Sequence, residues 1–173
     1  MAPPLPSRPM GIPLIGTQSP HAVVELFLDL SCPFSRKMYN TLDGDVFSQV
    51  KADEKLAGKV EFIFHNVPQP WHPQSPVMHE SMMAFALACD HDPEMLSAFA
   101  RSVFSAWPKF ADKYTADKSR TDIHAMCIDI AAQNLGDKLG GADAIRGKMA
   151  SFLNFSHLSD DEPNVSCRRF LGA

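Results

Sequence analysis

The residues with the clearest chemical potential are Cys32 and Ser35, which lie three positions apart in the stretch LDLSCPFSRKM. A cysteine thiolate can attack a disulfide and form a mixed disulfide with the attacked partner. A serine hydroxyl does not exchange with a disulfide, although it can donate a hydrogen bond to a thiolate. The pair therefore predicts catalysis at one thiol, without a second cysteine in the motif that releases the bound partner.

Two expected elements position Cys32. Residues 22–30, AVVELFLDL, form an apolar and partly β-branched run that is typical of a strand buried on both faces. Pro33 then suits the first turn of a helix, because its missing N–H would have no partner there. Ser35 can equally serve as a hydrogen-bonding residue of that first turn. Apolar residues continue at helical spacing, with a weak point at residues 43–45: Phe34, Met38, Leu42, Val46 and Val50.

The junction of strand and helix favours a reactive thiol at Cys32. The first N–H groups of a helix are unpaired and carry partial positive charge, so they stabilise a thiolate. Arg36 and Lys37 add positive charge in the same turn, whereas Asp29 opposes them from the strand end. We therefore expect a solvent-accessible thiolate, and the alternative is a small buried apolar residue at a strand end.

A second strand is expected at residues 59–65, KVEFIFH, which completes a βαβ unit with two parallel strands. The following loop, residues 66–76, contains four prolines and starts at the same edge of the sheet as Cys32. Trp71 and His72 in this loop are therefore candidate substrate-binding residues. Alternatively, Trp71 packs the helical segment onto the sheet and His72 is an exposed loop residue.

The chain divides into four segments. Residues 1–20 are rich in proline and are expected to form an extended arm. Residues 21–76 hold the βαβ core, and residues 77–158 form a helical domain, since apolar residues recur there at helical spacing. Residues 159–173 show no helical or strand period and are expected to form an irregular tail.

Composition limits the classes of function. The 173 residues are 45% hydrophobic and 21% charged, as in a soluble globular domain. The net charge is −4 and no stretch concentrates Lys and Arg, so we expect no nucleic-acid partner and no membrane partner. No stretch approaches transmembrane length, and the proline-rich N-terminus lacks the apolar region of a secretory signal. We therefore expect a cytoplasmic protein, although a mature form whose leader has been removed would look the same.

The four cysteines and seven histidines show no disulfide framework or metal pattern. Cys89 and Cys127 lie on apolar helical stripes and are expected in the core. Cys167, in the tail, is either a distant resolving thiol or an exposed thiol without a role. The three histidines between residues 65 and 79 match no usual zinc spacing, so we expect no metal.

The order strand, Cys32-Pro33-Phe34-Ser35, helix, strand, proline-rich loop and long helical segment resembles the DsbA-like branch of the thioredoxin superfamily over residues 22–158. In that branch a helical domain is inserted into a thioredoxin core. The resemblance implies that Cys32 is the attacking cysteine and that Ser35 replaces the resolving cysteine. It also implies that Pro33 and Phe34 tune the thiol and contact substrate. The same turn resembles the kappa-class glutathione transferases, whose reactive serine aligns with Cys32.

The sequence departs from the thioredoxin pattern after Leu158. Thioredoxin-type proteins continue with a cis-proline loop, a β-hairpin and a last helix, whereas residues 159–173 are too few for these elements. The chain resembles a family member that has been cut short. The expected fold is therefore α/β: a thioredoxin-like βαβ core with an inserted or appended DsbA-like helical domain and an incomplete sheet. The open sheet edge invites pairing with another chain, and hence oligomers.

Three functions are compatible with these features. The first is a thiol-disulfide oxidoreductase-like protein in which Cys32 forms a mixed disulfide with glutathione or a protein thiol. Glutathione is then a co-substrate, and no cofactor is tightly bound. The second is a kappa-type glutathione-transferase-like enzyme in which Cys32 or Ser35 contacts glutathione. The third is a non-catalytic thioredoxin-fold domain that binds partners through the open sheet edge.

Overall fold

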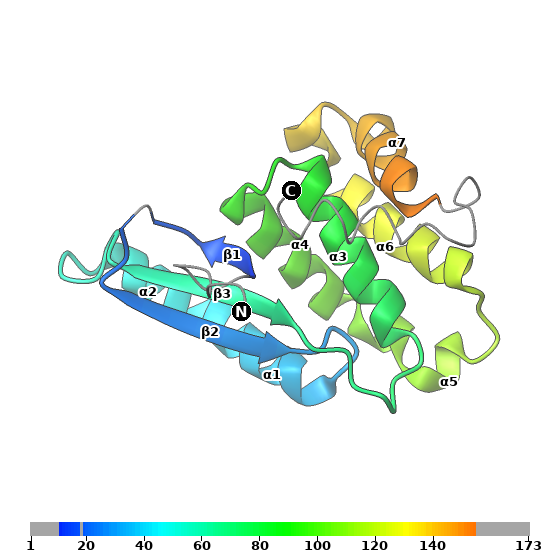
Figure 1. Cartoon of the computed structure of the whole chain (residues 1–173), viewed down its shortest axis with the longest axis horizontal. Helices are drawn as coiled ribbons and strands as arrows, with labels where there is room; N and C mark the ends of the chain where they lie inside the picture. The colour runs from blue at the N-terminus through cyan, green and yellow to red at the C-terminus, as the bar shows by residue number, and fades with distance from the viewer. Residues whose placement is uncertain (1–10, 18, 155–173) are drawn as a thin grey trace, which may run out of the picture.

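The computed structural model describes residues 11–17 and 19–154, which form a small sheet and a larger helical layer beside it (Figure 1). The three strands are β1 (Ile12–Ile15), β2 (Ala22–Leu28) and β3 (Val60–Asn66). β3 lies in the centre, parallel to β2 and antiparallel to β1. The parallel pair starts with Ala22 opposite Val60, which confirms the expected βαβ unit.

The N-terminal segment is not wholly an extended arm, because β1 lies within residues 1–20. Ile12 and Leu14 are each 1% exposed, so this short strand buries alternate side chains. Pro13 is tolerated because β1 is an edge strand, where a missing N–H leaves no partner unpaired. Flanking prolines hid the strand from the sequence pattern. The rest of the predicted arm, up to residue 10, lies outside the described residues.

Strand β2 forms where predicted, but it is not buried on both faces. It lies at the other edge of the sheet, and only Leu26 and Leu28 are buried along it. Val23 and Phe27, which point to the opposite face, are 38% and 64% exposed. The apolar run therefore predicted the strand correctly and its burial wrongly, because β-branched and aromatic residues favour strands as well as cores.

The helix after Cys32 continues without a break. It comprises α1 (Pro33–Thr41), a π-helical turn η1 (Leu42–Val46) and α2 (Phe47–Ala52). The predicted weak point at residues 43–45 falls inside the π-helical turn, so the helix widens there.

The first half of the predicted apolar stripe of this helix is exposed. Phe34 and Met38 are 80% and 54% exposed, so these two members of the stripe face solvent. Tyr39 faces inward in their place, since its hydroxyl donates to the Ser97 carbonyl oxygen at 2.7 Å. Its ring also stacks on Phe104, with 4.9 Å between the ring centroids. These contacts set the rotation of α1 and turn the apolar pair towards solvent.

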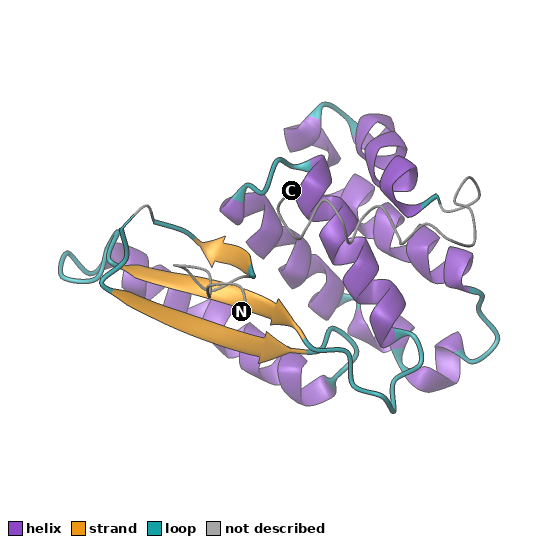
Figure 2. Cartoon of the chain, in the orientation of Figure 1, coloured by secondary structure: helices purple, strands orange, loops and turns teal. Residues whose placement is uncertain are grey.

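The rest of the described chain is helical, as predicted, and Figure 2 shows these helices gathered beside the sheet. They are α3 (Ser75–Ala88), α4 (Pro93–Ser105), α5 (Asp112–Thr115), α6 (Arg120–Leu135) and α7 (Ala142–Leu153), with short 3-10 turns η2 (Trp107–Phe110) and η3 (Gly136–Leu139). The predicted tail, residues 159–173, lies outside the described residues. Along the described part of the chain, no helix is long and apolar enough to cross a membrane.

One hydrophobic cluster joins the sheet to the helical layer. It includes Phe62 on β3 together with Phe85 and Phe99, whose rings stack with centroids 4.3 Å apart. Cys89 and Cys127 belong to this cluster, which confirms their predicted place in the core. The helical layer therefore holds the sheet, and with it the strand ends that carry the candidate site.

Candidate functional site

Cys32 lies at the junction that the sequence predicts. It directly precedes α1 with an extended backbone (φ −84°, ψ 125°), and its carbonyl oxygen accepts the Arg36 N–H at 3.0 Å. Pro33 occupies the first helical position. The Cys32 N–H donates to the Asp29 carbonyl oxygen at 3.1 Å, which closes the turn between β2 and α1. This placement at a helix N-terminus suits a thiolate.

The thiol is less accessible than predicted. Cys32 is 7% exposed, so the expectation of an open, solvent-accessible sulfur is wrong for this structure. The residue nevertheless lies outside the hydrophobic cluster that contains Cys89 and Cys127. The next two residues, Pro33 and Phe34, are exposed. Cys32 is therefore a buried residue that does not belong to the main hydrophobic cluster and is followed directly by exposed residues.

Ser35 points back towards the end of β2. Its hydroxyl oxygen accepts the Asp29 N–H at 3.1 Å, and the residue is buried. Among the hydrogen bonds of the described residues, none joins Ser35 to the Cys32 sulfur. The arrangement supports a structural role for Ser35 in the first turn. Its predicted hydrogen bond to a thiolate stays a prediction.

A buried carboxylate, Asp29, anchors this turn and is only 1% exposed. It accepts three short hydrogen bonds: from Ser75 Oγ at 2.6 Å, the Ser31 N–H at 2.8 Å and the Gln69 N–H at 3.0 Å. Burial raises the pKa of Asp29, but these hydrogen bonds outweigh burial and hold the pKa below its ordinary value. The ionised carboxylate thus ties the end of β2 to α3 and to the proline-rich loop.

His79, on α3, lies beside this carboxylate as a neutral ring. Its Nε2 accepts the Leu30 N–H at 3.2 Å, so Nδ1 carries the proton and donates to Asn66 Oδ1 at 2.6 Å. Nε2 lies 3.6 Å from Asp29 Oδ1, which is too long for a hydrogen bond. Burial lowers the pKa of His79 below 6.5, and the attraction of Asp29 only partly opposes this.

Trp107 is the contact that sequence reasoning missed. Its indole N–H donates to the Ser31 carbonyl oxygen at 2.7 Å, and the Arg36 guanidinium lies over its ring at 5.6 Å. Trp107 thus connects the helical layer to Ser31, which precedes Cys32, and to Arg36, which follows it on α1. No local signal marks it, because the hydrogen bond spans 76 residues.

The predicted pair Trp71 and His72 shows a different set of contacts. Trp71 is 64% exposed, so it does not pack the helices onto the sheet. His72 Nδ1 lies 3.2 Å from Asp112 Oδ1 on α5. Trp71 and Asp112 line a surface cavity that extends towards α6. The loop itself starts at the site, since the Gln69 N–H donates to Asp29. Substrate contact by Trp71 and His72 therefore stays a prediction.

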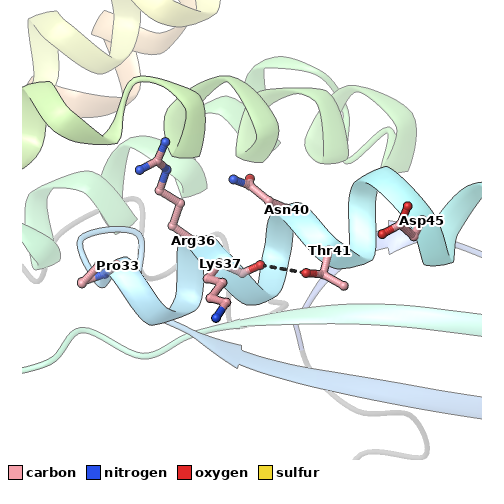
Figure 3. Close-up of a pocket in the computed structure, with 6 residues that line it drawn as sticks. All are labelled: Pro33, Arg36, Lys37, Asn40, Thr41 and Asp45. Atoms are coloured by element: carbon pink, nitrogen blue, oxygen red, sulfur yellow. Dashed lines mark hydrogen bonds between the residues drawn. The ribbon is translucent and has the colours of Figure 1, made fainter.

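A groove runs along the exposed face of α1, beginning one residue after Cys32 (Figure 3). Its volume is about 420 Å³, and it is lined by Pro33, Arg36, Lys37, Asn40, Thr41 and Asp45. Among the described residues, no cluster of His, Cys, Asp and Glu side chains is suited to hold a metal ion. The groove carries two cationic groups and an amide, together with the carboxylate of Asp45.

The parallel β2–β3 pair, the helix that starts beside Cys32 and the large helical layer define an α/β fold of the thioredoxin-like, DsbA-like class. The chain is similar to a crystal structure from Pseudomonas syringae that is described as a "putative protein-disulfide isomerase". The two are 21% identical with a TM-score of 0.52, over 88% of this chain and 94% of the other. No protein-family model and no curated protein matches the sequence. This likeness establishes the fold, and activity has to be argued from the site.

Proposed function

We propose that this protein carries out thiol-disulfide chemistry through one cysteine, Cys32. The observation that supports the proposal most is the place of Cys32 directly before α1, at the end of a parallel strand. Reactive groups in open α/β sheets gather at this edge, and a helix N-terminus favours the thiolate. The fold likeness to a protein described as a disulfide isomerase adds to it.

The proposed reaction needs a second thiol from solution. The Cys32 thiolate attacks the glutathionyl sulfur of a protein–glutathione mixed disulfide, a new S–S bond forms at Cys32, the old S–S bond breaks, and the protein thiolate leaves. A glutathione thiolate then attacks the mixed disulfide at Cys32, which restores the Cys32 thiolate and releases oxidised glutathione. Ser35 has no sulfur with which to resolve the intermediate. Glutathione is thus a co-substrate, a protein disulfide is the alternative partner, and the reducing cytoplasm is the setting that suits this cycle.

The low exposure of Cys32 sets a condition on this reaction. The sulfur lies outside the apolar cluster, and the adjacent Pro33 and Phe34 are exposed. A disulfide therefore reaches it after a local displacement of the turn, without unfolding of the core. Local openings of this kind cost less than global unfolding.

The test is incubation with oxidised glutathione followed by intact-protein and peptide mass spectrometry. We expect one adduct on Cys32 that reduced glutathione removes, and no adduct in Cys32→Ser. Cys89→Ala is the matched control and should keep the adduct. Ser35→Cys should release the bound glutathione without added thiol. Absence of the adduct in the unmodified chain contradicts the proposal, and conjugation of an electrophile without a mixed disulfide would point to transferase chemistry.

A second candidate function rests on the edge strand β2. Val23, Val24 and Phe27 are 38%, 37% and 64% exposed along this strand, which pairs on one side only within the described sheet. An exposed apolar edge can pair with another strand. On this candidate the protein is a non-catalytic binding domain, or forms oligomers through β2. Sedimentation that shows association, unchanged in Cys32→Ala and lost in Phe27→Lys, would favour it over redox chemistry.

A further inference from the structure

The groove along α1 has the form of a substrate site beside the thiol. Five of its residues recur at helical spacing and so share one face of α1: Pro33, Arg36, Lys37, Asn40 and Thr41. Figure 3 shows Arg36 and Lys37 extending to either side of this exposed face. A ligand that occupies this groove while its sulfur reaches Cys32 therefore meets both cations.

These two cations have no carboxylate partner among the described residues. The other arginines of the described chain are paired: Arg101 with Asp43, Arg120 with Glu80 and Arg146 with Asp129. Arg36 instead lies over the Trp107 ring, and its Nε atom is buried without a hydrogen-bond partner. Neither charge is neutralised by a carboxylate within the described part of the chain, so both guanidinium and ammonium groups can pair with an anion from solution.

The spacing suits the two carboxylates of a glutathionyl group. With a rise of 1.5 Å per residue, Arg36 and Lys37 lie roughly 6–8 Å along the helix from Cys32. In glutathione the glycine carboxylate lies about one residue length of 3.3–3.6 Å from the cysteine and the γ-glutamyl carboxylate about two, so both can reach this part of the helix. Asp45 lines the far end of the groove, roughly 20 Å from Cys32 by the same rise, which is beyond the reach of a tripeptide.

We propose that the α1 groove is an anion subsite, in which Arg36 and Lys37 bind the carboxylates of a glutathione-like thiol or disulfide at Cys32. Arg36 matches a carboxylate with its planar N–H groups, and Lys37 acts as a point charge. This inference rests on the proposed function for its chemistry, but its binding step does not require that reaction. It gives the site a preference for anionic small disulfides over uncharged ones.

The first experiment compares the rates of adduct formation at Cys32 with oxidised glutathione and with uncharged 2-hydroxyethyl disulfide. Removing one exposed charge pair is worth about two- to fivefold, so Lys37→Gln should slow the glutathione reaction by about threefold. The Arg36→Gln, Lys37→Gln double variant should slow it by about tenfold. The reaction with 2-hydroxyethyl disulfide should change less than twofold. Lys51→Gln, with the same charge change at an exposed position of α2, should leave both rates unchanged.

The second experiment measures binding without chemistry. Reduced glutathione is titrated into the Cys32→Ser chain by NMR, and the Lys37→Gln change in that background should weaken binding about threefold, with Lys51→Gln as control. Equal affinity in the two chains, or no binding to Cys32→Ser, overturns the anion subsite even if Cys32 reacts. Charge-dependent binding together with an unreactive Cys32 upholds the subsite and overturns only the proposed redox function.

Discussion

The turn that holds Cys32 and the helical layer that holds Cys89 and Cys127 give the same side chain opposite surroundings. Burial in the apolar layer raises the pKa of the Cys89 thiol to about 11 and of the Cys127 thiol to about 12. Cys32 instead directly precedes α1, and its backbone N–H donates to the Asp29 carbonyl oxygen. Apolar burial disfavours a thiolate, whereas a helix N-terminus is a setting that favours one.

The largest expected effect is a loss of stability from a substitution in the hydrophobic cluster, away from Cys32. Phe99→Ala should lower the free energy of unfolding by about 3–5 kcal/mol, because the fully buried ring stacks on Phe85 and leaves a cavity. Urea denaturation measures this loss. The reactivity of Cys32 in the folded protein should not change. Phe27→Ala, at a largely exposed ring that stacks on His65, is the control and should cost less than about 1.5 kcal/mol. Equal losses at the two positions would contradict the description of the core.

Asp29→Asn tests the polar network on the other side of the comparison. We expect a loss of about 2–3 kcal/mol at neutral pH, because hydrogen bonds to a charged acceptor are lost or weakened. The folded-state pKa of Asp29 is lowered, so its stabilisation is present at neutral pH and disappears as the pH falls through that value. The difference between the two chains, measured by urea denaturation, should therefore shrink in acid. Asp117→Asn, at an exposed carboxylate, should show no such difference.

Protonation of His79 should give a smaller pH dependence of the free energy of unfolding. Its pKa is lowered by burial, so the unfolded chain takes up a proton near pH 6.5 and the folded chain only at lower pH. Stability should therefore fall as the pH drops below about 6.5, by at most about 1.4 kcal/mol per pH unit for one proton. Denaturation curves of His79→Gln should lack this slope. The exposed His21→Gln should retain it, and a slope that survives in His79→Gln assigns the proton elsewhere.

Trp107→Phe gives the smallest expected change in stability. It removes the hydrogen bond to Ser31 and should cost about 0.5–1.5 kcal/mol. Because the turn around Cys32 then opens more often, alkylation of Cys32 by iodoacetamide should become faster, while Cys89 and Cys127 stay unreactive. Trp71→Phe, at an exposed ring, should change neither rate nor stability. An unchanged alkylation rate in Trp107→Phe would show that Trp107 does not limit access.

The sequence predicted the elements better than their burial. The strands at β2 and β3, the helix from Pro33 and the helical layer all occur near the expected positions. The exposure of Phe34 and Met38 was not predictable, because the rotation of α1 depends on the contacts of Tyr39 with α4. Strand β1 was missed because four residues are too short for a clear alternation.

For the candidate site, too, the sequence predicted the local features and not the contacts between distant segments. The single-thiol motif followed from the identities of Cys32 and Ser35, and its position followed from the adjoining strand and helix. The network around Asp29 was not visible in the sequence. Ser75 lies 46 positions away along the chain, and only the packing of α3 against the strand ends brings it within 2.6 Å.

By itself, then, the sequence determined that one sulfur stands where a strand gives way to a helix, since backbone conformation there depends on adjoining residues such as Pro33. Only the tertiary structure decided that this sulfur is covered, that Trp107 holds the turn and that His79 stays neutral beside Asp29. The reason is physical: backbone propensity acts over a few residues, whereas burial and electrostatic environment are set by segments that meet only when the chain folds.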